Sequence, residues 1–367
     1  MRSPRIAYIS TYAYAGGAAN DVRSRGVLDA LANLGCSVEV MDVSAGTTSS
    51  RAQHGGGRVR RLFGVLAVGG GLAAWLDGLP ERPDAVWLYG ADIRFSARAL
   101  RWARRRGVPV IGELVDWYEL DDVSGVGPTA VLALSNGIAM PWLRRRAAGF
   151  VVASSELAGY VARHGTPVEV VPAVMSAVGV SGSRRVADGV LRVGYVGSPG
   201  RRDGPTLSNL EHVARSWEGP PLEIHVAGVD PPSNGWVAAP DVRVVHHGRV
   251  PREEALALVG GCDATVLQRQ AERRFARAGF PSKVAESMVL GTTPVVNPTS
   301  DLAALLHSGR DCILLRDDSA AALLDGLTAL VESPIERRRV EATGVRLFSV
   351  ASAEGCLRAL LSTVGVL

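Results

Sequence analysis

Lys283 and Glu286 stand three residues apart in the stretch "AGFPSKVAESMVLGTTPVVNP", which covers residues 278–298. The pattern predicts a loop, a helix over 281–290 and then a buried strand containing "TPVV". Residues at this spacing share a helix face, so the two side chains could form a solvated ion pair worth about 0.2–0.5 kcal/mol. Such a pair needs an exposed helix, whereas most of this helix is apolar.

A second interpretation gives both side chains a ligand. Lys283 is expected in the first turn of the helix, where a cation is poorly matched to the helix dipole. A bound diphosphate would remove that mismatch. Glu286 lies one turn further on, and its two carboxylate oxygens could accept hydrogen bonds from two vicinal hydroxyl groups. The stretch alone leaves both interpretations open.

Two other loops carry residues that suit a phosphate. Gly16 and Gly17 lie between a predicted strand and a predicted helix, where glycine lets backbone N–H groups approach an anion. Arg201 and Arg202 lie in "GYVGSPGRRDG", and guanidinium groups suit bidentate contact with phosphate oxygens. Ordinary turns also use such residues. The joint occurrence of three such signals after predicted strands favours a phosphorylated nucleotide as ligand.

The elements that must position these residues alternate along the chain. Short β-branched runs such as "RIAYIS", "DAVWLY", "LRVGYVG" and "LEIHVAG" are separated by helical patterns. This alternation predicts right-handed βαβ units and parallel sheets. We expect an α/β fold of two tandem Rossmann-like doubly wound domains facing a cleft, over 1–175 and 190–345. A linker over 176–189 joins them, and the helical segment 346–367 could pack on either one.

Composition agrees with a protein of this class. A chain of 367 residues suits two domains, and 47% hydrophobic with 21% charged residues is a globular balance. The four cysteines show no paired spacing, which favours free thiols over a zinc site. No secretory pattern follows the N terminus, so we expect a cytoplasmic protein.

Basic residues gather in the N-terminal half, at 58–63, 101–106 and 142–146, and the sequence pI is about 9.1. Such clusters could hold an anionic partner or a membrane surface, or be solvated helix faces. The apolar run 62–76 is shorter than the roughly 20 residues of a spanning helix, which favours a buried or interfacial element. Aromatic residues are only 5%, and no recognition motif supports a nucleic-acid partner.

The stretch "GFPSKVAESMVLGTTPVV" resembles the signature of GT-B glycosyltransferases of the large retaining group 1 family, which includes glycogen synthase-like enzymes. It is similar to the branch with F-P-x-K before the glutamate. The resemblance extends to "VGYVGSPGRRDG" and "VRVVHHGRVPREEALALVGGCDATVLQ", and more loosely to the first half. It implies transfer of a sugar, of hexosyltransferase type, from a nucleotide diphosphate sugar to an acceptor hydroxyl with retention of configuration.

The resemblance also implies roles for single residues. Glu286 would hold the ribose hydroxyls of the donor, and the loop 246–250, with His247, would border the base. The diphosphate would be bound by side chains and backbone groups of Arg201, Arg202, Lys283, Gly279, Phe280, Pro281 and Ser282. Gly16 and Gly17 would close over the phosphate and the acceptor. Asp116, in "ELVDWYE", would lie near the transferred sugar as the candidate catalytic residue, with Glu113 and Glu119 behind it.

Cations and helix N termini would stabilise the leaving diphosphate, so we expect no metal and no cofactor beyond the nucleotide sugar. We expect a UDP or GDP donor rather than a deoxythymidine donor. Glu286 would accept hydrogen bonds from both ribose hydroxyls, and a deoxythymidine nucleotide lacks one of them. Ala278 departs from the family, many members of which carry a glutamate there. A sugar-nucleotide epimerase and a catalytically silent nucleotide-binding partner remain alternatives. The acceptor stays open between a small molecule, a glycan and a lipid-linked molecule, the last implying peripheral contact with the inner membrane face.

Overall fold

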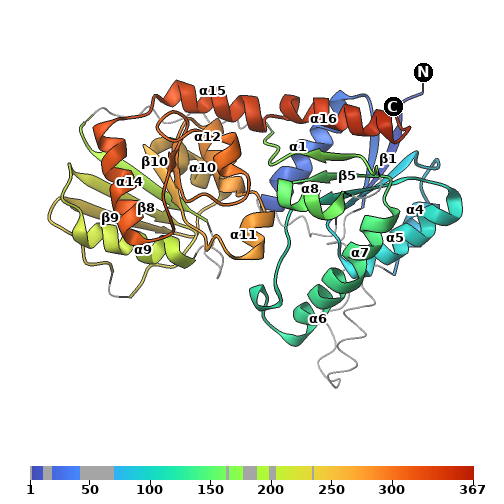
Figure 1. The fold of residues 1–367 in the computed structure, drawn as a ribbon, viewed down its shortest axis with the longest axis horizontal. Helices are drawn as coiled ribbons and strands as arrows, with labels where there is room; N and C mark the ends of the chain where they lie inside the picture. The colour runs from blue at the N-terminus through green and yellow to red at the C-terminus, as the bar shows by residue number, and fades with distance from the viewer. Residues whose placement is uncertain are drawn as a thin grey trace. The chain divides into compact units, whose positions relative to one another are not determined.

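The computed structural model describes residues 2–10, 19–41, 70–162, 165–176, 188–197, 204–233 and 235–367. The chain forms two compact units, traced in Figure 1. Unit 1 consists of Met1–Ser176 together with Val350–Leu367, and unit 2 consists of Ala177–Ser349.

Unit 1 is built on a six-stranded parallel sheet in the order β2-β1-β3-β4-β5-β6. Its strands are β1 (Arg5–Ser10), β2 (Ser37–Met41), β3 (Ala85–Tyr89), β4 (Val110–Leu114), β5 (Gly149–Val152) and β6 (Val168–Val170). Its helices are α1 (Ala19–Asn33), α4 (Leu72–Asp77), α5 (Ile93–Arg106), α6 (Val126–Leu134), α7 (Met140–Arg146), α8 (Ser155–Val161) and α16 (Val350–Thr363), with the 3₁₀ turn η2 (Leu120–Asp122) and the π-helical turn η3 (Ser135–Ala139).

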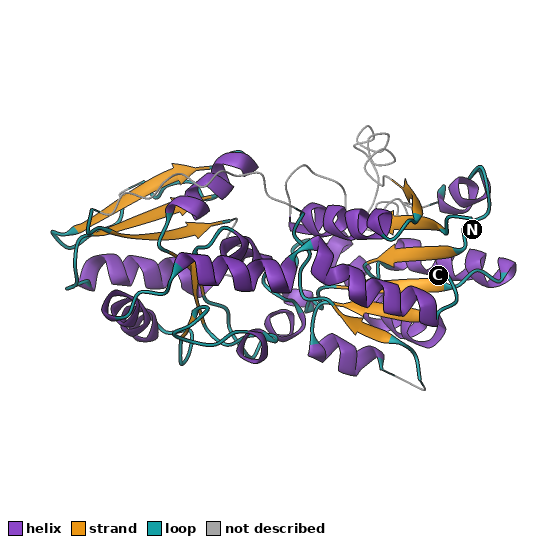
Figure 2. Ribbon diagram, turned by 90° about the horizontal axis from the view of Figure 1, so that it is seen from above, coloured by secondary structure: helices purple, strands orange, loops and turns teal. Residues whose placement is uncertain are grey.

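The strand order requires helices on both faces of this sheet. The chain moves from β1 to β2 in one direction and from β3 to β4 in the other, and right-handed crossovers then place α1 and α5 on opposite faces. Figure 2 shows helices on both sides of the strands. α1 packs against α16, and α5 packs against α4 and α7.

Unit 2 repeats the plan with a six-stranded parallel sheet in the order β12-β11-β10-β7-β8-β9. Its strands are β7 (Leu191–Val196), β8 (Leu222–Ala227), β9 (Val242–Gly248), β10 (Ala264–Leu267), β11 (Thr293–Val296) and β12 (Ile313–Leu314). Its helices are α9 (Gly204–Ser216), α10 (Arg252–Gly261), α11 (Arg274–Ala278), α12 (Ser282–Val289), α13 (Leu302–Leu305), α14 (Ala320–Glu332) and α15 (Arg337–Phe348). Two Rossmann-like units confirm the predicted fold class.

The core of unit 1 encloses a charged pair. Tyr8, Trp87 and Tyr89 are fully buried and neighbour one another across β1 and β3. Glu113 on the neighbouring strand β4 has a carboxylate that accepts hydrogen bonds at 2.7 Å from both Arg23 Nε and Trp87 Nε1. A buried carboxylate with these partners belongs to the scaffold, since removing either charge would leave the other unpaired.

The C-terminal helix α16 belongs to unit 1. Leu357 and Leu360 are buried, and Asn33 Nδ2 on α1 donates a hydrogen bond of 2.8 Å to Glu354 Oε1. Gly149 at the start of β5 has no room for a side chain, because an added Cβ would lie 2.7 Å from Leu360 Cδ1. The last helix therefore packs closely over the sheet that begins with the first strand.

The longest described helical stretch of unit 1 begins at Val126 and continues through α6, η3 and α7. Gly127 and Pro128, which resemble a loop in sequence, lie in its first turn. Proline is tolerated there because the first N–H groups of a helix have no partner within the helix.

Candidate functional site

In the parallel sheet of unit 2, the direction in which strands are added reverses between β7 and β10. These strands are neighbours, and the chain leaves β7 toward β8 on one side and β10 toward β11 on the other. In open parallel sheets, ligands bind beyond the carboxyl ends of the strands at this switch point. Gly197 directly follows β7, and α12 comes after β10, so both can line such a site.

The side chain of Lys283 lies directly against Gly197. A Cβ atom added to Gly197 would overlap Lys283 Cε and lie 2.7 Å from its Nζ. Gly197 also has a φ of +153°, which side chains rarely permit. Gly228, after β8, is equally constrained, because an added Cβ would lie 2.5 Å from the Gly197 carbonyl oxygen. The absence of side chains at both positions therefore brings the Lys283 ammonium to the end of β7.

Helix α12 begins with its N terminus uncapped by any side chain. Its first backbone N–H groups have no partners within the helix, and the helix dipole favours a negative charge there. Lys283 lies in this first turn, with its Nζ 5.2 Å from the centre of the Tyr195 ring. This arrangement, with an ammonium group beside an uncapped helix N terminus, suits a phosphate.

The loop before α12 can offer fewer backbone donors than expected. Gly279 N donates to Phe275 O at 2.9 Å, and Pro281 has no N–H group, so neither is a donor to a ligand. Phe280 and Ser282 retain this capacity. The Phe280 ring is buried against Phe348, with 5.3 Å between ring centres, which fixes the loop to α15.

Glu286 does not pair with Lys283. Its Oε1 accepts a hydrogen bond of 2.9 Å from Arg252 NH2 at the start of α10, and its side chain is only 16% exposed. Of the two interpretations of this stretch, the solvated ion pair within α12 is therefore ruled out. Sequence reasoning missed Arg252, although it carries the same signal as Lys283: a cation in the first turn of a helix, where it opposes the dipole.

The remaining predicted donor residues have different outcomes. Gly16, Gly17, Arg201 and Arg202 lie outside the described residues, and their roles stay predictions. In the sequence, Arg201 and Arg202 lie between the last residue of β7 and the first residue of α9. Ala278 is fully buried at the end of α11, so this position presents no side chain at the surface of the loop.

His247 lies within a strand. His246 and His247 belong to β9, so the loop predicted over 246–250 begins only at Arg249. The His247 ring stacks on His225 of β8, with His225 Nδ1 3.1 Å from His247 Nε2. Burial, reinforced by the neighbouring His247, lowers the pKa of His225 below its ordinary value. The His247 side chain is thus engaged within the sheet.

Asp116 lies in unit 1, just beyond the carboxyl end of β4. Its Oδ2 accepts a hydrogen bond of 2.6 Å from the Tyr118 hydroxyl, and Asn136 Nδ2 donates to the Tyr118 carbonyl at 2.9 Å. Asp116 and Tyr118 line a pocket of about 480 Å³. Its other lining residues come from the loop after β3, from the first turn of α5 and from the α6–α7 helix: Ala91, Asp92, Arg94, Pro128, Val131, Leu132, Ser135, Asn136 and Met140.

The two carboxylates expected behind Asp116 have structural partners. Glu113 is fully buried and forms an ion pair with Arg23, so its carboxylate cannot contact a substrate. Glu119 caps η2, where its side chain and that of Asp122 form a capping box. Carboxylate oxygens of Glu119, Asp121 and Asp122 lie within 4.8 Å of one another, a grouping that local capping explains. Asp116 is therefore the remaining carboxylate of the predicted set that faces a pocket.

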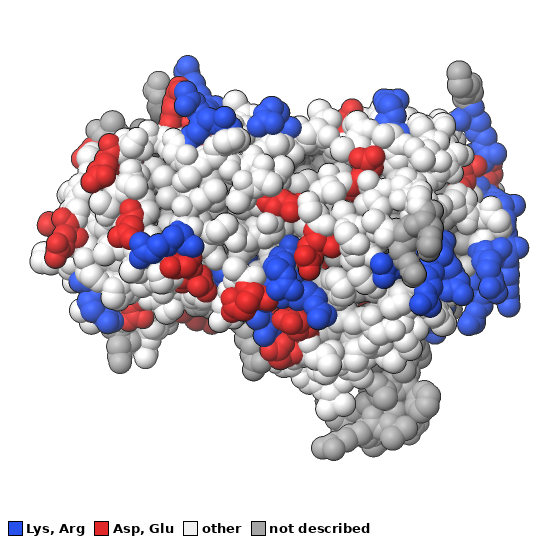
Figure 3. Space-filling view, in the orientation of Figure 1, with Lys and Arg blue, Asp and Glu red and all other residues white. Residues whose placement is uncertain are grey.

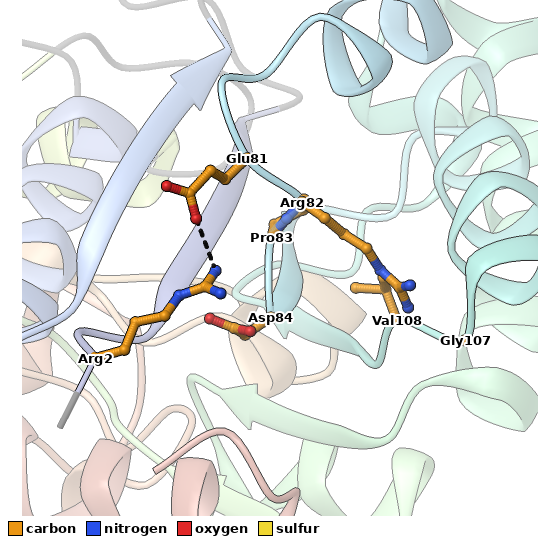
Figure 4. A pocket seen from close by; sticks show the side chains of 7 residues that line it. All are labelled: Arg2, Glu81, Arg82, Pro83, Asp84, Gly107 and Val108. Atoms are coloured by element: carbon orange, nitrogen blue, oxygen red, sulfur yellow. Dashed lines mark ion pairs between the residues drawn. The ribbon is translucent and has the colours of Figure 1, made fainter.

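A second cavity of unit 1, of about 530 Å³, lies at the opposite edge of the sheet (Figure 4). Arg2 and Glu81 form an ion pair of 3.3 Å across it, and Asp84 and Val108 stand just before β3 and β4. This is the amino-terminal edge of the strands, where ligands of open parallel sheets do not bind. The pocket beside Asp116 is the better placed of the two.

Comparisons with known proteins agree with this geometry. A family model described as "Glycosyl transferase 4-like domain" matches residues 16–177, and one described as "Glycosyl transferase-like" matches residues 206–355. No curated protein sequence matches the chain.

Solved structures of similar fold cover nearly the whole chain. Sucrose-phosphate synthase from Thermosynechococcus elongatus is 14% identical with a TM-score of 0.67, covering 99% of this chain and 100% of that chain. HepE from Anabaena in complex with UDP-glucose is 11% identical with a TM-score of 0.63, covering 98% and 99%. The apo lipopolysaccharide outer core galactosyltransferase WaaB is 15% identical with a TM-score of 0.62, covering 97% and 99%.

At these identities the structural likeness shows the fold, while the two family models account for the sequences of both units. The chain belongs to the group 1 family of GT-B glycosyltransferases.

Proposed function

We propose that this glycosyltransferase moves a hexose from a uridine or guanosine diphosphate sugar to an acceptor hydroxyl, with retention of configuration. The binding of the donor diphosphate in this proposal rests on one observation. Lys283 lies in close contact with Gly197 at the switch point of unit 2, beside the uncapped N terminus of α12. HepE, a protein of the same fold, has been crystallised with UDP-glucose, which supports a ligand of this class.

The donor diphosphate lies at the end of β7 in this proposal. Lys283 and the N terminus of α12 bind its oxygens, and Arg201 and Arg202 add positive charge to the site, as the resemblance implies. As the glycosidic bond breaks, negative charge grows on the leaving diphosphate, and these fixed positive groups stabilise it. Cationic side chains supply the charge that a metal would otherwise supply, so we expect transfer to continue in the presence of a chelator.

Glu286 selects the sugar of the nucleotide. Arg252 binds one of its carboxylate oxygens and thereby orients the group, and the carboxylate accepts hydrogen bonds from both ribose hydroxyls. A deoxyribonucleotide lacks one of these hydroxyls. The site should therefore bind UDP more tightly than dTDP.

The acceptor enters the pocket beside Asp116. The Asp116 carboxylate, held by the Tyr118 hydroxyl, accepts a hydrogen bond from the acceptor hydroxyl and keeps it oriented for attack. Pro128, Val131 and Leu132 form an apolar wall of the same pocket. An acceptor that offers a hydroxyl on an otherwise apolar body would fit this lining.

Calorimetric titration of the purified chain with UDP, GDP, dTDP and ADP tests the donor site. Glu286→Ala should weaken the preferred nucleotide at least about tenfold, because hydrogen bonds to a charged group contribute about 1.5–3 kcal/mol. Glu332→Ala, an exposed glutamate of the same unit, is the matched control and should bind normally. A folded chain that binds none of the four nucleotides would contradict the proposal.

Product analysis tests the reaction. With a nucleotide sugar and an acceptor alcohol, the anomeric configuration of the product should equal that of the donor, and Asp116→Asn should reduce the rate without weakening nucleotide binding. Binding without turnover for a broad acceptor panel would favour the silent nucleotide-binding partner. Conversion of the nucleotide sugar without an acceptor would favour the epimerase.

A further inference from the structure

Helix α6 is made almost entirely of apolar residues, none of which is fully buried. Val126 at its start is 73% exposed, and Ala133 is also exposed. A helix of this composition in a soluble protein normally turns an apolar face into the core. Exposed apolar residues grouped on one helix are typical of a site that meets another molecule or a membrane.

The exposed residues continue along one face of the following helix. α6, η3 and α7 form one helical stretch, Val126–Arg146, which among the described residues is long and apolar enough to cross a membrane by length and composition. Only 22% of its apolar window is buried. Exposed Ala133, Gly137 and Trp142 follow Val126 at helical spacings, with one residue added by the π-helical turn. The result is one apolar stripe ending at Trp142.

Arginines gather where this stripe ends. Arg145 and Arg146 are exposed, whereas Arg144 is directed onto the ring of Tyr160 at 4.7 Å. Arg146 lies 5.7 Å from the Trp142 ring centre. Trp142 and Arg146 also line a groove of about 140 Å³ with Ala97, Leu100, Arg101 and Arg104 of α5. Figure 3 shows basic side chains concentrated over the part of unit 1 that contains α5.

We propose that this face of unit 1, the exposed stripe from Val126 to Trp142 with the adjoining arginines of α7 and α5, binds the surface of an anionic lipid bilayer. Val126 and the exposed side of α6 enter the boundary between head groups and acyl chains, and Trp142 lies at the head-group level, where tryptophan is enriched. The arginines contact lipid phosphates. The helix lies on the membrane and does not cross it, because its C-terminal half packs against α5.

The charge of the face distinguishes this partner from a second copy of the chain. A symmetric dimer through the same patch would bring the arginines of α5 and α7 against their own copies, and like charges repel. A bilayer with anionic head groups offers both the complementary charge and an apolar interior. The inference goes beyond glycosyl transfer and can be tested without any measurement of activity.

The test is sedimentation of the full chain with phosphatidylcholine vesicles that contain or lack phosphatidylglycerol. We expect binding to the vesicles with phosphatidylglycerol only, and weaker binding at high salt, because the lipid contacts of the arginines are screened. Binding that is equal for both vesicle types, or absent from both, would overturn the proposal.

Two pairs of variants separate the apolar and the basic contributions. Val126→Asp places a carboxylate at the first position of α6, where the helix dipole favours it, so the helix should remain folded. Its control is Val237→Asp, which changes a valine 67% exposed in unit 2. Arg145→Glu with Arg146→Glu is matched by Arg338→Glu with Arg339→Glu, two exposed neighbouring arginines of α15.

Val126→Asp and the α7 double variant should each lose at least about tenfold in vesicle binding, while both controls should bind like the original chain. Nucleotide titration and circular dichroism confirm that each variant is folded. Vesicle binding that survives Val126→Asp unchanged would show attraction by charge alone and would overturn insertion of α6. A monomer mass for Val126→Asp beside a dimer for the original chain would assign the face to self-association instead.

Discussion

An alanine in place of Gly197 would add one methyl group at the most crowded point of the donor site. The new Cβ would overlap Lys283 Cε and stand 2.7 Å from its Nζ. Because the end of a lysine side chain is flexible, we expect Lys283 to move away while the backbone stays in place. The ammonium would then leave the position beside β7 where the donor phosphate is proposed to bind.

The cost of this substitution has two parts. A φ of +153° is almost confined to glycine, and an alanine forced to keep it should lose about 1–3 kcal/mol of unfolding free energy. Displacing Lys283 should remove one charge-assisted hydrogen bond, worth about 1.5–3 kcal/mol, which weakens nucleotide diphosphate binding roughly 10- to 150-fold.

Calorimetric titration and thermal unfolding separate these two effects. Gly309→Ala is the control, because Gly309 has a φ of +76° with nothing within 4 Å of an added Cβ, so it should lose stability and retain full affinity. Lys283→Met added to Gly197→Ala should cause little further loss of affinity, since the same contact has already been removed. A folded Gly197→Ala chain that binds nucleotide diphosphate as tightly as the original would refute the role given to Lys283.

Three further predictions concern charged groups. Arg252→Met should lower the ratio of UDP affinity to dTDP affinity about tenfold. Adding Glu286→Gln should lower this ratio no further, because both changes disturb the same carboxylate. Additive losses of affinity in the titration would contradict this. Arg23→Met should destabilise unit 1 by about 3–5 kcal/mol, because it leaves Glu113 charged and unpaired. Amide hydrogen exchange in β4 should become faster, whereas unchanged exchange would contradict a stabilising buried pair. The lowered pKa of His225 means that the unfolded chain binds a proton more readily than the folded chain. The melting temperature of unit 2 should therefore fall as the pH drops below about 6.5, and His225→Gln should flatten that decline. An equal dependence of melting temperature on pH in both chains would reject the effect.

The parallel sheets could be predicted because β-branched runs and helical periods alternate clearly along both halves of the chain. "RIAYIS" forms β1 over the predicted residues, and Gly35 adopts the positive φ expected of a glycine that ends a helix. Lys283 was singled out by its conflict with the helix dipole, a local property that the sequence displays directly.

The partners of these residues could not be predicted, because they come from distant segments. Arg252 lies 34 positions before Glu286, and no local spacing connects the two. Glu113 resembled Asp116 in sequence, and only the fold separates the carboxylate enclosed by Arg23 and Trp87 from the one beside a pocket. The loop that the resemblance implied over 246–250 begins only at Arg249, because β9 extends through Gly248.

The packing of α16 on unit 1 reverses the usual order of folding on the ribosome. Domains generally fold as units as they are synthesised, the N-terminal one first. Here residues 2–176 lack the helix that covers α1 and β5 until residues 350–363 have been made, whereas all of unit 2 precedes this helix. Unit 2 can therefore complete its structure before unit 1, and a chain stalled near residue 349 would expose to chaperones the side of α1 that α16 otherwise covers.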